Sequence, residues 1–382
     1  MQLAIDCAGF TPAEADRLRQ AMSAKRAPER IAELRQRLLD GMAERGIPRP
    51  VAEDIYVKIL AFSNYGFPES HAISFAYLVY ASAWLKRYYP AAFTAALLRN
   101  QPMGFYAPHT LINDARRHGV VVLGADVNAS DALATLEGFA GAGPADLKGP
   151  AIRAGLSGVR NLGSKAAERV AAGRPYRDLE DFAARTGLPA AALEALALAG
   201  AFGCFGLSRR AALWAAGAAA TVREGQLPGT SPGLDPEGPG SAPPLPTMTP
   251  AEETLADLWA TGTYGTHPVA HIRARLAERR VLTAAAVRSA ATDSGVTVAG
   301  LVTHRQQPPT ARGVVFLSLE DETGMVNVIC PPQVWARHRR MATVAPALLV
   351  QGRIERTGGA VNLVAAVLRP LQVAAGPSRD FR

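Results

Sequence analysis

The chain has 382 residues, of which 48% are hydrophobic, so it is long enough for two to four domains with buried cores. Its 41 Lys and Arg residues outnumber its 33 Asp and Glu residues, and the net charge of +8 favours an anionic partner, nucleic acid first and an acidic membrane surface second. Three isolated cysteines fit neither a disulfide framework nor a metal site. No basic leader is visible and the longest apolar run, 72–84, is too short to cross a bilayer, so we expect a soluble, cytoplasmic protein.

Residues 1–100 are predicted to be helical. Thr11 and Pro12 start one helix, residues 31–42 form a second and residues 51–62 form a third. These segments are expected to make up the first domain.

Basic residues gather toward the end of the first of these helices. Arg19 lies there, followed by Lys25 and Arg26, and such cations can hold the oxygens of a polyphosphate. The alternative is a solvated basic helix face.

Residues 65–98 are rich in aromatics and alanine and carry almost no charge before Lys86. Ser70 is a candidate helix cap. Apolar residues then recur at helical spacing, at Ile73, Tyr77, Tyr80 and Trp84. A core helix would be enough to explain that spacing. Polar side chains also gather at the start of the run, at Asn64, Glu69, Ser70 and His71. Because helix N-termini favour anions, these residues indicate a phosphate or nucleotide site, although His71 could equally be a core histidine.

Residues 101–215 mix a short β segment at 120–127 with helical pieces. Within them, two apolar anchors, Val159 and Leu162, bracket a tight turn that ends in Gly163. A helix follows at Ser164, which is the arrangement of a helix-hairpin-helix. The N–H groups at that helix start could bind one DNA phosphate, and Lys165 adds charge. A looser second copy at 193–213 has Arg209 and Arg210 at its helix start. The alternative for both is a plain pair of helices.

Beyond these segments the composition changes twice. Residues 216–250 are rich in Gly, Pro, Ser and Ala and are predicted to be a flexible linker. Residues 251–292 form a helical connector, and residues 293–371 contain five strands with one helix after the third, before a tail at 372–382. That order is typical of an OB-fold barrel.

Within the predicted barrel, Arg305 and Phe316 are candidates for single-strand binding, since OB folds combine basic and aromatic side chains. Further candidates are Arg312, Trp335 and the basic run 337–340. Trp335 could equally be core, and the basic run could be a solvated helix face. His267 and His271 are four residues apart, but Pro268 separates them and no third ligand is near, so we interpret them as structural.

The motifs of residues 65–98 carry a family resemblance. YGFPESH, followed by SFAYLVYASAWLKRYYPAAF, resembles the fingers segment of C-family bacterial DNA polymerases, the alpha subunits of polymerase III. The PES form is most similar to the error-prone, damage-tolerant branch. The likeness continues through residues 101–130 and, in weaker form, to Pro370. It implies a multidomain α+β protein with a helical fingers region, a helix-hairpin-helix region and a C-terminal OB-fold β-barrel.

The resemblance also assigns roles to residues. It implies that Arg19 faces the triphosphate of the incoming nucleotide, with Lys25 a further candidate from its position near the end of the helix. It also implies that Ser70, His71 and Phe75 line the pocket of the nascent base pair. Where the family has two adjacent arginines, this chain has Arg19 and Gln20. Primer-template DNA and dNTP are the implied partners, and a sliding clamp and other mutagenesis proteins are further candidates.

One part of the family pattern is missing. The Asp-x-Asp cluster that binds catalytic Mg²⁺ in the polymerase palm does not occur in this sequence, so we assign no catalytic residue and no metal site. Mg²⁺ is expected only for the full-length enzyme. The leading hypothesis is the C-terminal part of an error-prone polymerase acting in translesion synthesis and damage-induced mutagenesis, which binds DNA but cannot extend it alone. The alternative is a non-catalytic DNA-binding repair module.

Overall fold

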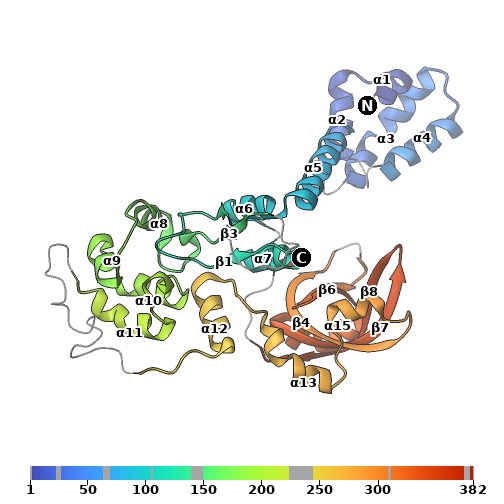
Figure 1. Ribbon diagram of the computed structural model, residues 1–382. Helices are drawn as coiled ribbons and strands as arrows, with labels where there is room; N and C mark the ends of the chain where they lie inside the picture. Colours follow the sequence, from blue (N-terminus) through green and yellow to red (C-terminus); the bar gives the residue numbers. More distant parts are fainter. Residues whose placement is uncertain are drawn as a thin grey trace. The chain divides into compact units, whose positions relative to one another are not determined.

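The computed structural model describes residues 2–22, 27–62, 69–104, 106–138, 149–222, 244–308, 311–373 and 379–381. The chain divides into two compact units, Met1–Trp84 and Leu85–Arg382. Figure 1 labels their helices and strands. Within the described residues, no helix is both long enough and apolar enough to cross a membrane.

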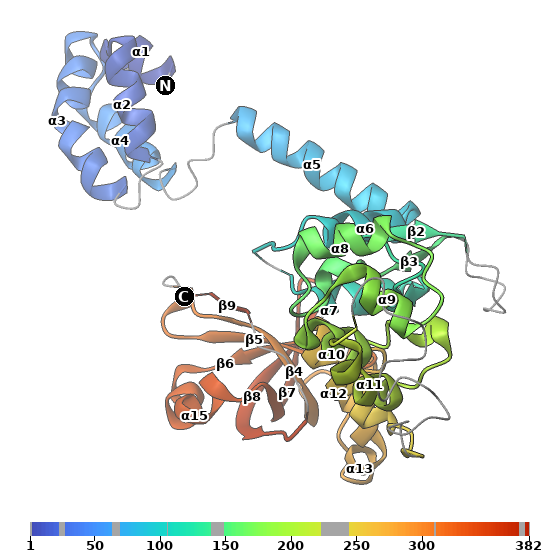
Figure 2. The ribbon, with the colours of Figure 1, turned by 90° about the vertical axis from the view of Figure 1, so that its left-hand side faces the viewer.

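The core of the first unit is made by four helices (Figure 2). They are α1 (Gln2–Ala8), α2 (Pro12–Met22), α3 (Ala27–Glu44) and α4 (Arg49–Phe62), which confirms the three helices predicted here. Their apolar sides meet around Leu18, Ile31 and Met42. Gly41 allows α3 to lie against α1, because a Cβ at this position would be 2.0 Å from the carbonyl oxygen of Ala8.

The aromatic run forms the helix α5 (Glu69–Tyr88), as predicted, and the boundary between the two units falls within it. Ile73, Tyr77, Tyr80 and Trp84 do share one helical face, but all four are exposed. Among the residues that the structure describes, this face is therefore not buried in a core.

The second unit begins with two helices and a small sheet. The helices are α6 (Pro90–Arg99) and α7 (Pro108–Arg117), and the strands are β1 (Val122–Leu123), β2 (Thr135–Glu137) and β3 (Ala151–Arg153). Strand β3 lies in the middle, parallel to β1 and antiparallel to β2. The predicted β segment is thus confirmed, although β1 is only two residues long.

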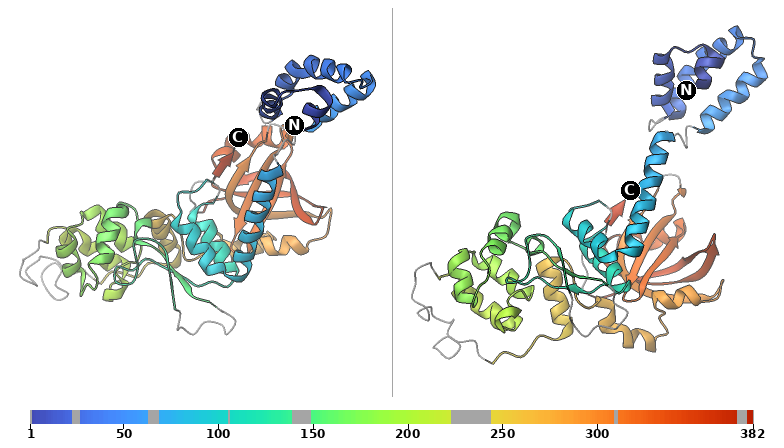
Figure 3. Two further views of the ribbon diagram at one scale, coloured as in Figure 1. Left: turned by 90° about the horizontal axis from the view of Figure 1, so that it is seen from above. Right: turned by 45° about the horizontal axis from the view of Figure 1, so that its top comes forward.

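The helical hairpins follow the sheet. Their elements are η1 (Leu156–Gly158), α8 (Gly163–Ala172), α9 (Leu179–Thr186), α10 (Ala190–Leu198), η2 (Gly203–Phe205) and α11 (Arg209–Ala219). They share a core that includes Phe182, Leu193 and Phe202. Within the second unit, these hairpin helices and the C-terminal barrel lie at opposite ends, with α7 and a connector helix between them (Figure 3).

The predicted helical connector contains α12 (Pro250–Thr261), η3 (Pro268–Ile272), α13 (Arg273–Glu278) and α14 (Ala284–Ser289). Thr249 and Glu252 form a capping box that fixes the start of α12. The predicted linker at 216–250 falls largely on residues 223–243, which lie outside the described residues, and α11 continues to Ala219, inside the segment predicted as linker.

The C-terminal block is a closed five-stranded barrel, as predicted. Its strands are β4 (Gly295–Gln306), β5 (Val315–Asp321), β6 (Gly324–Cys330), β7 (Ala347–Thr357) and β8 (Ala360–Pro370). They pair in the order β5-β6-β8-β7-β4, and β4 closes the barrel onto β5. Helix α15 (Pro332–Val344) follows the third strand, and β6 runs parallel to β8. In the predicted tail, β9 (Arg379–Phe381) pairs with β4.

One predicted turn is partly wrong. The sequence EDETG at 320–324 predicts a turn that joins the second and third strands, yet Glu320 and Asp321 belong to β5 and are 0% and 2% exposed. The turn is confined to Glu322 and Thr323. Acidic residues beside a glycine are typical of a turn. Here ion pairs with residues far along the chain offset the free-energy cost of burying the two carboxylates.

Candidate nucleic-acid interface

The first hairpin has the geometry that its sequence predicts. Val159 and Leu162 are buried anchors on either side of the turn. Asn161 and Gly163 have φ angles of 62° and 69°, which reverse the chain between η1 and α8. A Cβ at Gly163 would meet nothing within 4 Å, so its backbone conformation, rather than crowding, is what favours glycine there.

The start of α8 has no side-chain cap, because the residue that precedes it is Leu162. The first N–H groups of a helix have no partner inside the helix, and they carry partial positive charge. Ser164 and Lys165, in the first turn, are both exposed. The arrangement can therefore hold an anion between backbone N–H groups, a hydroxyl and an ammonium group.

A pocket of 450 Å³ adjoins this helix start. Ser164 lines it together with Arg99, Arg116 and Tyr264. Arg116 donates hydrogen bonds to the backbone carbonyls of Tyr264, at 2.5 Å, and Gly265, at 3.1 Å, and burial lowers its pKa. With Arg209, which also lines it, three arginines therefore border the same pocket as Ser164.

The second hairpin differs at its helix start. Ser208 caps α11 by accepting a hydrogen bond from the N–H of Ala211. Arg209 donates to Asp257 at 2.7 Å and to the carbonyl of Leu198 at 2.8 Å, and Arg210 pairs with Glu252 at 2.7 Å. Both arginines predicted to bind DNA are thus bonded to acidic residues of α12 in this structure.

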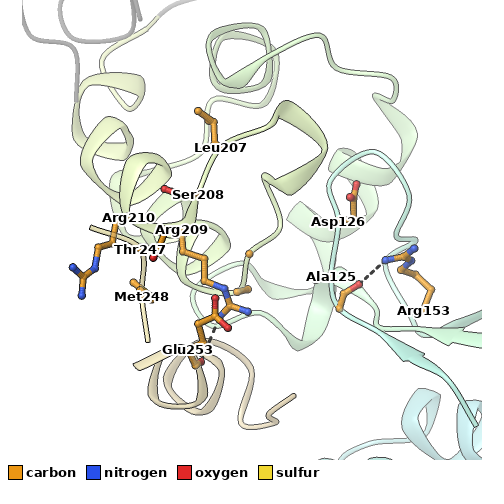
Figure 4. Close-up of a pocket in the computed structure, with 13 residues that line it drawn as sticks. Ala125, Asp126, Arg153, Leu207, Ser208, Arg209, Arg210, Thr247, Met248 and Glu253 are labelled. Atoms are coloured by element: carbon orange, nitrogen blue, oxygen red, sulfur yellow. Dashed lines mark hydrogen bonds between the residues drawn. The ribbon is translucent and has the colours of Figure 1, made fainter. Parts of the chain in front are cut away.

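Figure 4 shows the pocket in front of α11, which has a volume of 410 Å³. Arg209 also reaches the carbonyl of Glu253, at 3.4 Å. On the opposite wall Arg153 donates to the carbonyl of Gly124 at 3.0 Å. The cations of this pocket are therefore held by backbone and carboxylate oxygens of the same unit.

The barrel presents a polar and aromatic platform on β4, β5 and β6. Strand register places Gln306 beside Phe316 and His304 beside Ser318. Ser318 in turn lies beside Asn327 of β6. We call these five residues the barrel platform. Phe316 is 36% exposed while its neighbours Val315 and Leu317 face the core. An exposed aromatic ring among polar groups can stack on a nucleic-acid base.

The other barrel candidates separate into inner and outer groups. Arg305 is 7% exposed and donates through Nε to the carbonyl of Ala342 at 2.9 Å, so its guanidinium holds α15 to the barrel. Trp335 packs against the barrel core, which confirms the core alternative. Arg312 is exposed, as are Arg337, Arg339 and Arg340.

The residues assigned to the nucleotide fall in the first unit. Arg19 is an exposed residue of α2 and donates to Asp16 at 2.8 Å. Phe75 is 47% exposed on α5. Lys25 lies outside the described residues, and so do the side chains of Ser70 and His71, whose backbone belongs to α5.

The two connector histidines have structural contacts. His267 is buried, accepts a hydrogen bond at Nδ1 from the N–H of Val269 at 3.2 Å, and burial lowers its pKa to about 3. His271 contacts the hydroxyl of Thr254 at 2.8 Å. In the part of the chain that the structure describes, no three His, Cys, Asp or Glu residues are grouped as a metal site would require.

Sequence reasoning missed a buried polar junction between α7, the connector and the barrel. Glu320 accepts from Arg117 at 2.8 Å and lies 3.5 Å from Asn113, whose amide also donates to the hydroxyl of Tyr264 at 2.8 Å. Burial raises the pKa of Glu320 and that of Tyr264. Asp321 pairs with Arg273 at 3.0 Å. Acidic residues at the end of an otherwise apolar strand were the available signal.

Comparison with known families agrees with the predicted order of a fingers region, helical hairpins and a barrel. The finger domain of the bacterial DNA polymerase III alpha subunit matches residues 1–46, a helix-hairpin-helix motif matches residues 119–212 and an OB-fold nucleic acid binding domain matches residues 296–371. These three matches define the class: a multidomain α+β protein with a fingers region, helical hairpins and an OB-fold barrel.

Error-prone DNA polymerases match the whole chain. The enzyme of Mycolicibacterium paratuberculosis is 52% identical over 389 residues, that of Nocardia farcinica is 52% identical over 397, and that of Anaeromyxobacter dehalogenans is 46% identical over 387. The chain therefore belongs to the C-family bacterial DNA polymerases, in the error-prone branch, as the resemblance predicted. The matched region includes 100% of this chain but only 33–34% of each relative, so the chain spans about a third of their length.

Solved structures add little to these matches. The hypothetical protein ygiW from E. coli covers 24% of this chain, with 22% identity and a TM-score of 0.20, which is too low to support a functional argument.

Proposed function

We propose that this chain is the part of an error-prone translesion polymerase that holds primer-template DNA and contributes to the nucleotide pocket. The observation that carries the proposal is the uncapped start of α8 at Gly163, where Ser164 and Lys165 are exposed. A DNA phosphate bound there would be read without regard to base sequence. A polymerase that moves along DNA requires this kind of contact.

The barrel platform supplies the second proposed contact. Phe316 would stack on a base of the single-stranded template, and the polar residues around it would bind the backbone or base edges. Arg312 and the exposed arginines of α15 would add charge. Arg305, Arg209 and Arg210 are already bonded within the protein, so we propose that they act by holding the binding elements in place.

For the nucleotide we propose Arg19 and Phe75 as contacts to the triphosphate and the base, with Lys25, Ser70 and His71 beside them. The supporting observations are the match of the polymerase finger domain to residues 1–46 and the exposure of Arg19 on α2. Arg19 is already bonded to Asp16, so the nucleotide would compete with a surface ion pair, whose cost to break is small.

The chain does not supply the catalytic carboxylates in the residues described, which do not fit a Mg²⁺ site. We therefore derive no catalytic step within it. We propose that the rest of the polymerase provides the metal site, and that this chain alone binds DNA without extending it. A sliding clamp and other mutagenesis proteins remain proposed partners of the whole enzyme.

DNA binding can be measured by fluorescence anisotropy with a labelled primer-template at several salt concentrations. We expect binding that is independent of sequence and that weakens steeply with salt, because phosphate contacts release counterions. Binding that is insensitive to salt would contradict the phosphate site at α8. A primer-extension assay with Mg²⁺ and four nucleotides should give no product, and robust synthesis by this chain would overturn the division of labour proposed here.

A further inference from the structure

Helix α5 carries large apolar side chains that face solvent. Ile73, Tyr77, Leu78, Val79 and Tyr80 are 63%, 74%, 55%, 65% and 73% exposed, and we call them the α5 apolar surface. All five belong to the first compact unit. Residues 72–85 contain no charged side chain. Such a stretch is unusual on a protein surface, where large apolar patches mark interaction sites.

The α5 apolar surface extends around the helix. At about 100° per residue, Ile73, Tyr77 and Tyr80 share one side, while Leu78 and Val79 point to the other. By contrast, α3 in the same unit buries Ile31 and Met42 and exposes polar residues elsewhere. A helix that is apolar on all sides belongs to the interior of a protein. One neighbour on one face would leave the other side of α5 exposed.

The chemistry of the surface restricts what can cover it. A nucleic acid requires cations, and none occurs between residues 72 and 85. A protein interior fits, because it offers apolar groups on several sides. The relatives contain such additional protein: about two thirds of the Mycolicibacterium paratuberculosis polymerase lies outside the region that matches this chain.

We propose that α5 is a core helix of the assembled polymerase, and that its apolar surface is covered by the part of the polymerase that the relatives carry outside the matched third. This inference rests on the proposed function, since it takes the chain to work as part of a whole polymerase. The fingers helix would thereby also be the element that joins the nucleotide-binding unit to the rest of the enzyme.

The test combines the full 382-residue chain with the separately produced remainder of the Mycolicibacterium paratuberculosis polymerase, and measures their dissociation constant by analytical ultracentrifugation. Tyr77→Asp and Val79→Asp change opposite sides of α5. Val344→Asp is the matched control, because Val344 is 77% exposed on α15 in the barrel. Since all three positions are exposed, we expect the isolated variants to keep the circular dichroism and melting temperature of the parent chain.

We expect the parent and Val344→Asp to bind the remainder equally, and each α5 variant to bind at least about 30-fold more weakly. Hydroxyl-radical footprinting should show Tyr77 and Tyr80 accessible in the isolated chain and protected in the complex. No binding by the parent, or equal binding by all variants, would overturn the proposal.

Two other occupants would give different footprints. Protection of Tyr77 that grows with the concentration of the isolated chain would indicate a second copy, and protection in the dilute monomer would indicate cover from elsewhere in the same chain. Either result would overturn the proposal. DNA binding by the same samples distinguishes a failure of this proposal from a failure of the proposed function. DNA binding depends on α8 and the barrel, so it is expected to persist in the α5 variants.

Discussion

The two helical hairpins of the second unit differ at the start of their C-terminal helix. The helix of the first hairpin, α8, starts without a side-chain cap and exposes Ser164 and Lys165. The helix of the second, α11, starts at a Ser208 cap, and its first two arginines are bonded to Asp257 and Glu252 of α12. Both hairpins contact α12, the first through the N–H of Arg160, which donates to the carbonyl of Ala260 at 2.7 Å. The start of α8 is nevertheless exposed to a ligand, whereas the cations at the start of α11 are bonded to α12.

The difference shows that a basic pair at a helix start does not by itself identify a DNA contact. Arg209 and Arg210 have the more basic sequence, yet acidic residues 48 and 42 positions later neutralise them. Lys165 is a single cation at its helix start, but it stands beside N–H groups that no side chain caps. Whether a cation is available to a phosphate depends on its partners, which are set by tertiary contacts.

The attachment of the second hairpin should account for the largest effect on stability. Asp257 accepts from Arg209 at 2.7 Å and from the N–H of Gly265 at 3.1 Å, and its side chain is 17% exposed. Asp257→Ala leaves a partly buried guanidinium without its counter-charge, so we expect the free energy of unfolding to fall by about 2 to 3 kcal/mol. Urea unfolding measures this change.

The exposed pair of Arg353 and Asp293, with side chains 60% and 67% exposed, provides the control for that experiment. Asp293→Ala should change the free energy of unfolding by less than about 1 kcal/mol, because solvent screens a surface ion pair. Equal losses from the two variants would mean that the contact of α11 with α12 contributes nothing beyond an ordinary surface pair.

Acid should weaken the connector that holds the second hairpin. His267 is buried with its pKa lowered to about 3, so as pH falls below about 6.5 the unfolded chain takes up a proton that the folded chain does not. The contribution of neutral His267 to the free energy of unfolding is therefore fully present above pH 6.5 and is lost progressively toward pH 3. Between pH 7 and pH 5 we expect a loss of about 2 kcal/mol.

Measurement of unfolding by urea at both pH values checks this window. His267→Asn retains a side-chain acceptor for the N–H of Val269 but does not titrate, so most of the pH dependence between 7 and 5 should disappear. The same slope in parent and variant would place the acid-sensitive group elsewhere.

The open hairpin should be sensitive to its backbone conformation. Gly163 has φ of 69°, a region in which a Cβ costs about 1 to 2 kcal/mol. Gly163→Ala should lower stability by that amount, or shift the turn and weaken DNA binding by about fivefold to tenfold. Anisotropy and urea unfolding on the same sample distinguish these results. Gly217→Ala, within α11 and with space for a methyl group, is the control and should leave DNA binding unchanged.

The smallest expected effect separates the two hairpins most directly. Lys165→Ala should weaken DNA binding by about threefold to tenfold and reduce the slope of log affinity against log salt by about 1, because one phosphate contact is lost. Arg210→Ala, on the attached hairpin, should change affinity by less than about twofold. A larger effect of Arg210→Ala would show that its ion pair with Glu252 opens to bind DNA.

Much of the fold was predictable because it depends on short-range patterns in the sequence. The number of barrel strands and the position of the helix after the third strand were predicted correctly, since alternating apolar positions and turn glycines are short-range signals. The hairpin anchors Val159 and Leu162 were recognised in the same way. The burial of Glu320 was not predictable, because its partners Arg117 and Asn113 lie about 200 positions earlier.

The sequence by itself determined the family and the order of the parts, because the aromatic run at 65–98, the glycine turns and the strand periods are local properties of the chain. It also determined that α5 is apolar along its whole middle section. Tertiary structure alone decided which cations remain exposed: Arg209, Arg210 and Arg305 are bonded within the protein, while Lys165 lies in solvent beside the start of α8. The physical reason is that the availability of a charge depends on burial and on partners far along the chain, and neither is set by neighbouring residues.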